Sequence, residues 1–198
     1  DLGFGLHTLE DSGKGFSFRK DEPLIMRYGE DGGPSAADML NTKSAVDLEK
    51  IFNEYGEERF SKRIAERIVE ERRRAPIKRT TDLVRIIREV VPERYKKGAL
   101  DPATRTFQAL RIAVNDEFGN IRNGLEAALR VLADNGRIAV IAFHSGEDRI
   151  AKEVFKQAAK NGALEIITKH VIKPHRSEIL LNRASRSAKL RVGIKHIV

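Results

Sequence analysis

Residues 137–160, RIAVIAFHSGEDRIAKEVFKQAAK, decide the fold that the sequence predicts. The first seven residues are almost entirely apolar and rich in β-branched side chains, and a short run of this kind favours a buried parallel strand. The following HSGEDR indicates a turn into a helix, where we expect Ser145 to cap the helix and Asp148 to close a capping box. Strand, turn and helix in this order are typical of α/β proteins.

The flanking sequence extends the same pattern. Asp101 and Pro102 open a helix with a capping acid and a proline in the first turn. A second helix, over about 117–132, places its Ile and Leu residues on one face. After residue 160, LEIITKHVI and AKLRVGIKHI indicate two more strands, separated by an irregular basic loop. Residues 101–198 are therefore predicted to form an α/β sheet.

The first hundred residues follow another pattern. Residues 1–34 are rich in glycine and turn residues and are predicted to be a loop packed on another part of the protein. From 35 to about 92 the apolar spacing is helical, with Ser35 as the first cap, a break at Pro76 and an end at Pro92. Residues 35–100 are therefore predicted to be a helical insertion between 1–34 and 101–198.

Composition and charge restrict the class of protein. The 198 residues carry a net charge of +8 and include no cysteine, which excludes disulfides and thiolate metal sites. No run approaches the roughly 20 apolar residues of a membrane helix, and no signal peptide is visible. Nine basic residues face five acidic ones over 57–79, and eight face one over 169–198. Such blocks are either solvated faces or contacts to a polyanion, with nucleic acid first.

Candidate site residues lie where predicted strands end, because ligands of open α/β sheets bind there. One such end is Asp1-Leu2-Gly3, and the other is the turn that begins at His144, which is either beside a bound base or a packed histidine. Arg105 and Arg111 lie on the helix after Pro102, and Arg105, near its first turn, is poorly placed for the helix dipole, which favours a phosphate or carboxylate partner. The last strand and the loop before it offer RNA contacts or ordinary exposed charges, namely Arg186, Lys189 and Arg191. No metal-ligand spacing, P-loop or nucleophile elbow is present.

Several longer sequence motifs resemble those of a known protein family. DLG, GFSFRKD, PSAAD, YGEERFSKRIA, DPATRTFQALRI, FHSGEDRI and RSAKLRV occur in the order found in the MraW/RsmH family, which the chain resembles over nearly its whole length. That family comprises S-adenosylmethionine-dependent methyltransferases that act on cytosine N4 in bacterial small-subunit ribosomal RNA. The resemblance implies a Rossmann-like methyltransferase sheet, here its C-terminal part only, interrupted by an all-helical insertion domain.

The resemblance also implies partners and a location. The substrate would be small-subunit ribosomal RNA or the assembled small subunit, in the cytoplasm and without a membrane. A homodimer is compatible with such enzymes, although nothing in the sequence specifies one. The family's Gly-rich cofactor loop and first strands are absent, so we expect this chain to be the C-terminal part of a longer protein, with weak or no cofactor binding by itself.

Individual roles follow from the matching words. Asp1 matches the acid that contacts S-adenosylmethionine and is the candidate catalytic residue, and Thr8 stands at a second cofactor-contacting position. Met39, after PSAAD, would line the base pocket. The other predicted substrate contacts are Arg27, Arg105, His144, Arg186 and Lys189.

The departures from the family pattern cluster near the predicted active site. Gly5 and Leu6 replace two small hydroxyl residues, and Thr8 replaces a glutamine. Ile25 stands in place of an acid, and Gly146 in place of a leucine. We nevertheless expect the parent protein to be a methyltransferase that is divergent but active. The alternatives are a homologue that keeps RNA binding but has lost methyl transfer, and a purely structural assembly factor.

Overall fold

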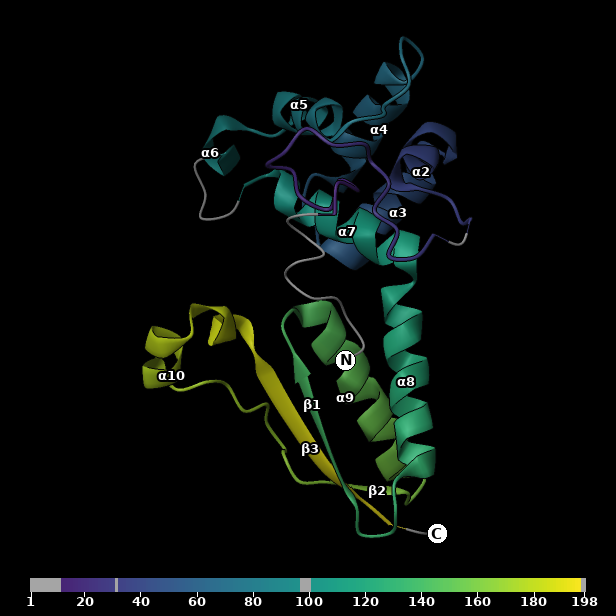
Figure 1. Cartoon of the computed structure of the whole chain (residues 1–198). Coiled ribbons are helices and arrows are strands. Elements are labelled where there is room, and N and C mark those ends of the chain that lie inside the picture. The colour runs from purple at the N-terminus through teal and green to yellow at the C-terminus, as the bar shows by residue number, and fades with distance from the viewer. Residues whose placement is uncertain (1–11, 31, 97–100, 197–198) are drawn as a thin grey trace. The chain divides into compact units, whose positions relative to one another are not determined.

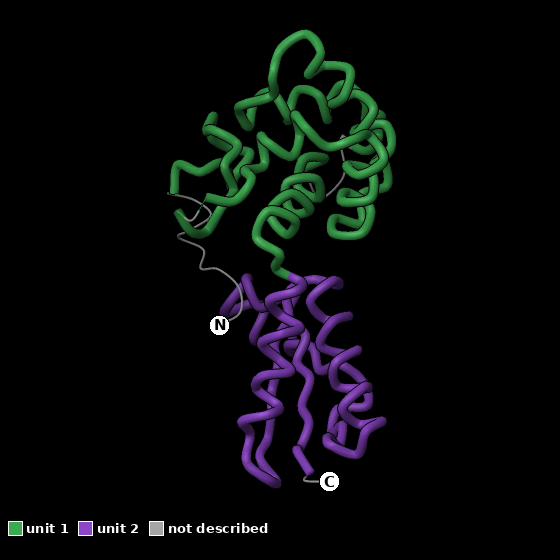
Figure 2. Tube along the Cα trace, turned by 90° about the vertical axis from the view of Figure 1, so that its right-hand side faces the viewer, with its two compact units in different colours: residues 1, 3–117 green, residues 2, 118–198 purple. Residues whose placement is uncertain are grey.

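The computed structural model describes residues 12–30, 32–96 and 101–196 (Figure 1). Asp1 and Thr8, the predicted cofactor contacts, lie outside these residues. The described residues divide between Glu117 and Phe118 into two compact units, coloured separately in Figure 2. Unit 1 is helical and unit 2 combines helices with a sheet, so the predicted mixture of α and β structure is confirmed.

Unit 1 contains the predicted run of helices. Ser35 caps the first helix as expected, because its hydroxyl accepts the Asp38 N–H while the Asp38 carboxylate accepts the Ser35 N–H. The Asp101 carboxylate likewise accepts the N–H of Ala103, the first residue of α7. Pro76 lies between two helices and Pro92 follows the end of one, as predicted. The helices are α2 (Ala36–Thr42), α3 (Ala45–Gly56), α4 (Ser61–Glu71), α5 (Thr80–Val90), α6 (Glu93–Lys96) and α7 (Ala103–Asn115).

The core of unit 1 forms around α3, which packs on α4 and α7. The contact with α7 is close, because a Cβ on Gly56 would lie 2.5 Å from the carbonyl oxygen of Arg105. The loop 12–30 contributes Phe16, Leu24 and Met26 to the same core, which confirms that this segment is a packed loop. The domain bounds predicted above, 1–34, 35–100 and 101–198, concern the whole protein and stay a prediction.

Unit 2 is a three-stranded sheet with helices. The strands are β1 (Arg137–Ala142), β2 (Leu164–Ile166) and β3 (Lys189–Lys195), in the order β1-β3-β2. The helices α8 (Glu117–Val131) and α9 (Ser145–Lys160) share one apolar core with the sheet, which includes Leu125, Ile138, Phe155 and Leu164. A short helix, α10 (Arg176–Leu181), and a 3₁₀ turn, η1 (Arg183–Ser187), precede β3.

The expectation of a buried parallel strand at 137–143 is not met among the described strands, where β1 pairs with β3 alone. β3 lies between β1 and β2 and runs antiparallel to both, so β1 and β2 point the same way without being neighbours. Along β1 the burial alternates, with Ile138 and Ala142 buried and Ala139 and Ile141 exposed. An apolar run covered on one face only has the same composition as one covered on both, and therefore the sequence could not distinguish them.

Candidate nucleic-acid interface

The turn between β1 and α9 is built by a capping box one residue earlier than predicted. His144, in extended conformation, is the N-cap, and its Nδ1 accepts the Glu147 N–H at 3.4 Å. The Glu147 carboxylate returns to the backbone and accepts the N–H groups of Phe143 at 2.7 Å and His144 at 3.3 Å. The prediction that Ser145 and Asp148 form this box is wrong, because the last extended residue is His144 and the box partner must follow three residues later.

His144 is a packed side chain in this turn. Its Nε2 lies 3.1 Å from Glu147 Oε1, and its ring centroid lies 6.0 Å from that of Phe118. Burial raises the pKa of Glu147, but the hydrogen bonds from the His144 side chain and from two backbone N–H groups outweigh it and hold the pKa below its usual value. These contacts match the packed-histidine alternative, and a role of His144 beside a bound base stays a prediction.

Asp148 ties the start of α9 to β3. Its two carboxylate oxygens accept from Arg191 Nε at 2.7 Å and Nη2 at 3.2 Å, and Lys189 Nζ lies 3.8 Å away. The Arg191 side chain is only 11% exposed, so its prediction as an RNA contact is wrong: the guanidinium is already neutralised. Lys189 pairs across the sheet with Ala142, which places it at the edge where β1 turns towards His144.

Arg186 lies in a segment that is rich in exposed cations. It belongs to η1, in the stretch 169–188 that leads into β3. Five exposed cations of this stretch form no ion pair with any residue that the structure describes: Lys169, Lys173, Arg176, Arg183 and Arg186. The prediction of a polyanion contact in the C-terminal block therefore keeps Arg186 as a candidate; Lys189 faces Asp148, and its role as an RNA contact stays a prediction.

The two arginines of α7 are already satisfied within unit 1. Arg111 donates to both carboxylate oxygens of Glu117, at 2.8 and 3.0 Å. Arg105 donates from Nη1 to the backbone carbonyl of Glu57 at 2.8 Å. The guanidinium of Arg105 therefore lies against the left-handed residue that ends α3, and none of the described carboxylates forms an ion pair with it. Its role as an RNA contact stays a prediction.

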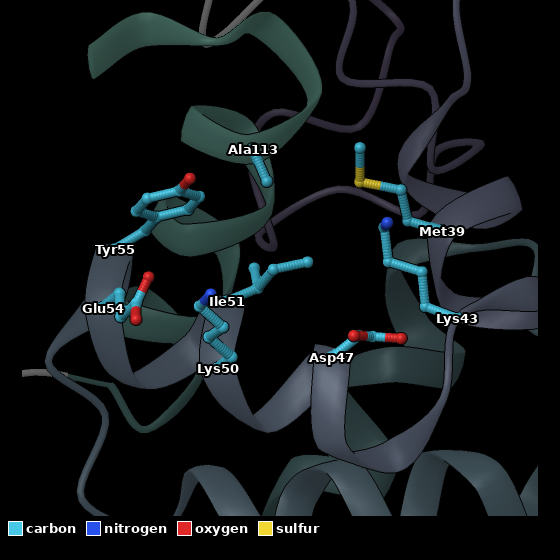
Figure 3. A pocket seen from close by; sticks show the side chains of 8 residues that line it. All are labelled: Met39, Lys43, Asp47, Lys50, Ile51, Glu54, Tyr55 and Ala113. Atoms are coloured by element: carbon cyan, nitrogen blue, oxygen red, sulfur yellow. The ribbon is translucent and has the colours of Figure 1, made fainter. Parts of the chain in front are cut away.

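Met39 lines a pocket of about 280 Å³ between α2, α3 and α7 (Figure 3). In Figure 3, Met39 and Tyr55 lie on opposite sides with Ile51 between them, and the polar rim is mixed in charge. The lining residues are Met39, Lys43, Asp47, Lys50, Ile51, Glu54, Tyr55 and Ala113. An apolar floor with an aromatic wall and a polar rim suits a planar, hydrogen-bonding ligand such as a nucleobase. This arrangement supports the prediction for Met39 without assigning the ligand.

Arg27 lies in the same unit, where its Nη1 donates to the Gly33 carbonyl at 2.7 Å. It follows Met26, a fully buried residue with φ of 55°, in the left-handed region that side chains other than glycine rarely adopt. Asn115 holds this backbone, because its Nδ2 donates to the Met26 carbonyl at 2.7 Å.

Sequence reasoning missed the residues that hold this loop. Tyr28 donates its hydroxyl to Glu117 Oε1 at 2.5 Å, and its N–H donates to Asn115 Oδ1 at 2.9 Å. Its ring stacks on Phe16, with 5.5 Å between centroids. The partners are nearly ninety residues apart in the chain, and therefore no local sequence pattern predicts these hydrogen bonds. Arg111 and Tyr28 thus converge on one buried carboxylate.

The basic block 57–79 divides into paired and unpaired cations. Arg67, Arg74 and Arg79 form ion pairs with acidic side chains, and Arg72 donates to two carbonyls at the end of α2. Among the described residues, the exposed cations of this block without an ion pair are Arg59, Lys62, Arg63, Arg73 and Lys78. The solvated-face interpretation therefore describes the first group, and only the second group is available to a polyanion.

Two absences concern the described residues alone. Across 12–30, 32–96 and 101–196, no three His, Asp or Glu side chains gather as metal ligands. Within the same ranges, every helix is too short or too polar to span a bilayer.

Comparison with known proteins identifies the family. The model of the MraW methylase family matches residues 1–196. Three curated relatives are each named Ribosomal RNA small subunit methyltransferase H. The protein of Rhodospirillum centenum is 53% identical over 79% of this chain and 46% of its own length. That of Trichlorobacter lovleyi is 50% identical over 80% and 51%. That of Dictyoglomus thermophilum is 48% identical over 98% and 63%.

The chain thus spans about half of the first two relatives and somewhat under two thirds of the third. The family match extends over nearly all of its residues, unit 1 and unit 2 alike. This chain belongs to the MraW methylase family.

Proposed function

We propose that the whole protein transfers a methyl group from S-adenosylmethionine to the exocyclic N4 of a cytosine in small-subunit ribosomal RNA. The observation that carries the proposal is the family match over residues 1–196, together with relatives named as small-subunit ribosomal RNA methyltransferases. Within this activity, we assign to the present chain the contacts to RNA and the last strands of a Rossmann-like methyltransferase sheet, which the helices of unit 1 interrupt.

The free edge of β1 supports the Rossmann-like assignment. Among the described residues, β1 pairs through one edge only, with β3. β1 and β2 run in the same direction, so a parallel sheet can continue from the other edge of β1. The side chains of Ile141 and Phe143 are 61% and 54% exposed on the face of β1 opposite Ile138 and Ala142, and this is the face that helices would cover in a doubly wound parallel sheet.

S-adenosylmethionine supplies an activated methyl group when it is bound. The described residues of the β1–α9 turn do not fit it, because Glu147 is occupied by backbone N–H groups and Asp148 by Arg191. The proposed cofactor contacts are therefore Asp1 and Thr8, outside the described residues. The task of this chain is positioning, because cytosine N4 is a weak nucleophile and must be held in line at about 3–3.5 Å from the methyl carbon.

The described residues contribute through charge and shape. The unpaired cations at the sheet edge and on α4 can hold the RNA backbone, while the pocket beside Met39 offers an apolar wall to a base. The base must leave its stack to reach any enclosed site. A homodimer and a cytoplasmic location, which the family resemblance implies, stay predictions.

Incubation of the full-length parent with S-adenosylmethionine and small-subunit ribosomal RNA tests the proposal. Nuclease digestion and mass spectrometry should show N4-methylcytosine, and calorimetry should show cofactor binding that Asp1→Ala weakens. Binding of RNA without cofactor binding or methylated product would replace the proposal with that of a non-methylating RNA-binding homologue.

A further inference from the structure

The segment 169–188 of unit 2 carries an apolar pair that no described residue covers. α10 has no buried residue, and its last two side chains, Leu180 and Leu181, are 77% and 90% exposed. Figure 1 shows α10 standing off from the strands, at the side where β3 begins. Two adjacent leucines at this exposure cost free energy in water, so a partner for them would be stabilising.

The segment is nevertheless anchored at both ends. An antiparallel bridge between Ile172 and Leu190 fixes its beginning to the start of β3. Near its end, Ser185 is buried, and its hydroxyl donates to the Asn182 carbonyl at 2.8 Å. α10 lies between these anchors, and the leucines are therefore presented by a defined turn of chain.

Charge complementarity identifies the partner. The segment 169–188 carries the five exposed cations named above on both sides of the leucines in the sequence, while Glu178 is the one acid of the segment. A surface with this surplus repels a second copy of itself and attracts a polyanion. Leucines between cations are suited to RNA, in which apolar base faces lie between phosphates.

The position of the segment in unit 2 agrees with this partner. It leads into Lys189, which pairs with Ala142 at the end of β1, two residues before His144. The leucines are therefore carried by the connection that enters this edge of the sheet, where ligands of α/β proteins bind.

We propose that Leu180 and Leu181 form a wedge that inserts into the base stack of the bound RNA and keeps the target nucleotide unstacked. The proposal rests on the proposed function, because a methylated cytosine has to leave its stack. Arg183 and Arg186 hold the phosphates on either side of the inserted pair. Affinity and unstacking are thus separate contributions from neighbouring residues.

The test uses the full-length protein and a single-stranded oligoadenylate with one cytosine beside 2-aminopurine, whose fluorescence rises when it unstacks. The unmodified protein should raise the fluorescence. Leu180→Ser/Leu181→Ser should abolish the rise and weaken binding roughly 10-fold, without changing the salt dependence of binding. Val131→Ser is the matched control, since Val131 is 85% exposed on α8 of the same unit.

The cation variants separate the two contributions. Arg183→Gln/Arg186→Gln should lower the slope of log K against log salt by about 1.4, at about 0.7 for each lost phosphate contact. Lys152→Gln/Lys156→Gln, on the exposed face of α9, should leave the slope unchanged.

The outcomes distinguish the wedge from its alternatives. An unchanged fluorescence rise in the leucine variant would overturn the wedge while the proposed methyl transfer stands. A leucine variant that shifts the sedimentation of the free protein would show that the pair is covered by a second copy, and a variant that unfolds would show that the rest of the protein covers it. Absence of RNA binding by the unmodified protein would overturn both proposals.

Discussion

Gly146 is the second residue of α9 and lies against Phe118 of α8. A Cβ placed on Gly146 would lie 2.3 Å from Phe118 Cζ, a separation that two carbon atoms do not tolerate. Because Gly146 is not among the glycines with positive φ, the backbone itself accepts any residue. Gly146→Ala therefore tests packing against one ring, together with the gain in helix propensity.

Two opposing contributions set the change in the free energy of unfolding that Gly146→Ala causes. Overpacking a filled core costs about 1–3 kcal/mol, while replacing a helical glycine with alanine stabilises by roughly 0.5–1 kcal/mol. The net expectation for Gly146→Ala is a loss of about 1 kcal/mol, reduced to the extent that the ring of Phe118 can turn away. Gly146→Leu, which introduces the residue that the resembled family carries here, should cost more.

Hydrogen exchange of the amides of α8 and α9 measures the effect, because it reports the opening free energy of unit 2 by itself. Phe118→Leu removes the far end of the ring, and Gly146→Ala is therefore measured a second time in the Phe118→Leu variant. In that background, Gly146→Ala should change sign and stabilise by roughly 0.5–1 kcal/mol, which is the helix contribution alone. A single Gly146→Ala variant as stable as the parent, or the same effect in both backgrounds, would refute the reasoning.

Three further predictions concern buried charges. Glu147→Gln should lower the free energy of unfolding at neutral pH, because the folded pKa of Glu147 lies below its ordinary value of 4.5. Denaturant titrations should show that the difference in stability between the two proteins shrinks as the pH falls through the folded pKa. Asp148→Asn should cost about 2–3 kcal/mol, since Arg191 loses its partner in a largely buried site, and Arg191→Met in the same background should recover part of this loss in urea unfolding. Tyr28→Phe removes the hydrogen bond to Glu117 and should lower the stability by about 1 kcal/mol, and unchanged thermal unfolding would show that water replaces the hydroxyl.

Local signals predicted much of the secondary structure. Ser35, Pro76 and Pro92 mark helix boundaries through side-chain capping and a missing N–H, and these effects act within a few residues. The cap of α9 was misplaced by one residue, because His144 and Ser145 both precede a carboxylate at the correct spacing. The backbone conformation of His144 decides between them, and that conformation depends on where β1 ends.

In the candidate site, too, the sequence predicts what depends on a local motif and misses what depends on a distant partner. The motif PSAAD pointed to Met39, which lines a pocket, and its contact to a base stays a prediction. Arg191 was misjudged, because in the sequence it is one cation among eight in a block with a single acid. Its partner Asp148 lies 43 residues away and is brought to it only by the packing of α9 on the sheet.

The sequence by itself determined the family, the basic character, and the order of helices and strands, since composition, apolar period and capping are properties of neighbouring residues. Only the tertiary structure decided the antiparallel register of β1 and β3, the pairing of Asp148 with Arg191, and the capture of Tyr28 by Glu117. The physical reason is that strand partners and buried ion pairs join residues distant in the chain. Their energies depend on geometry that no short stretch of sequence encodes.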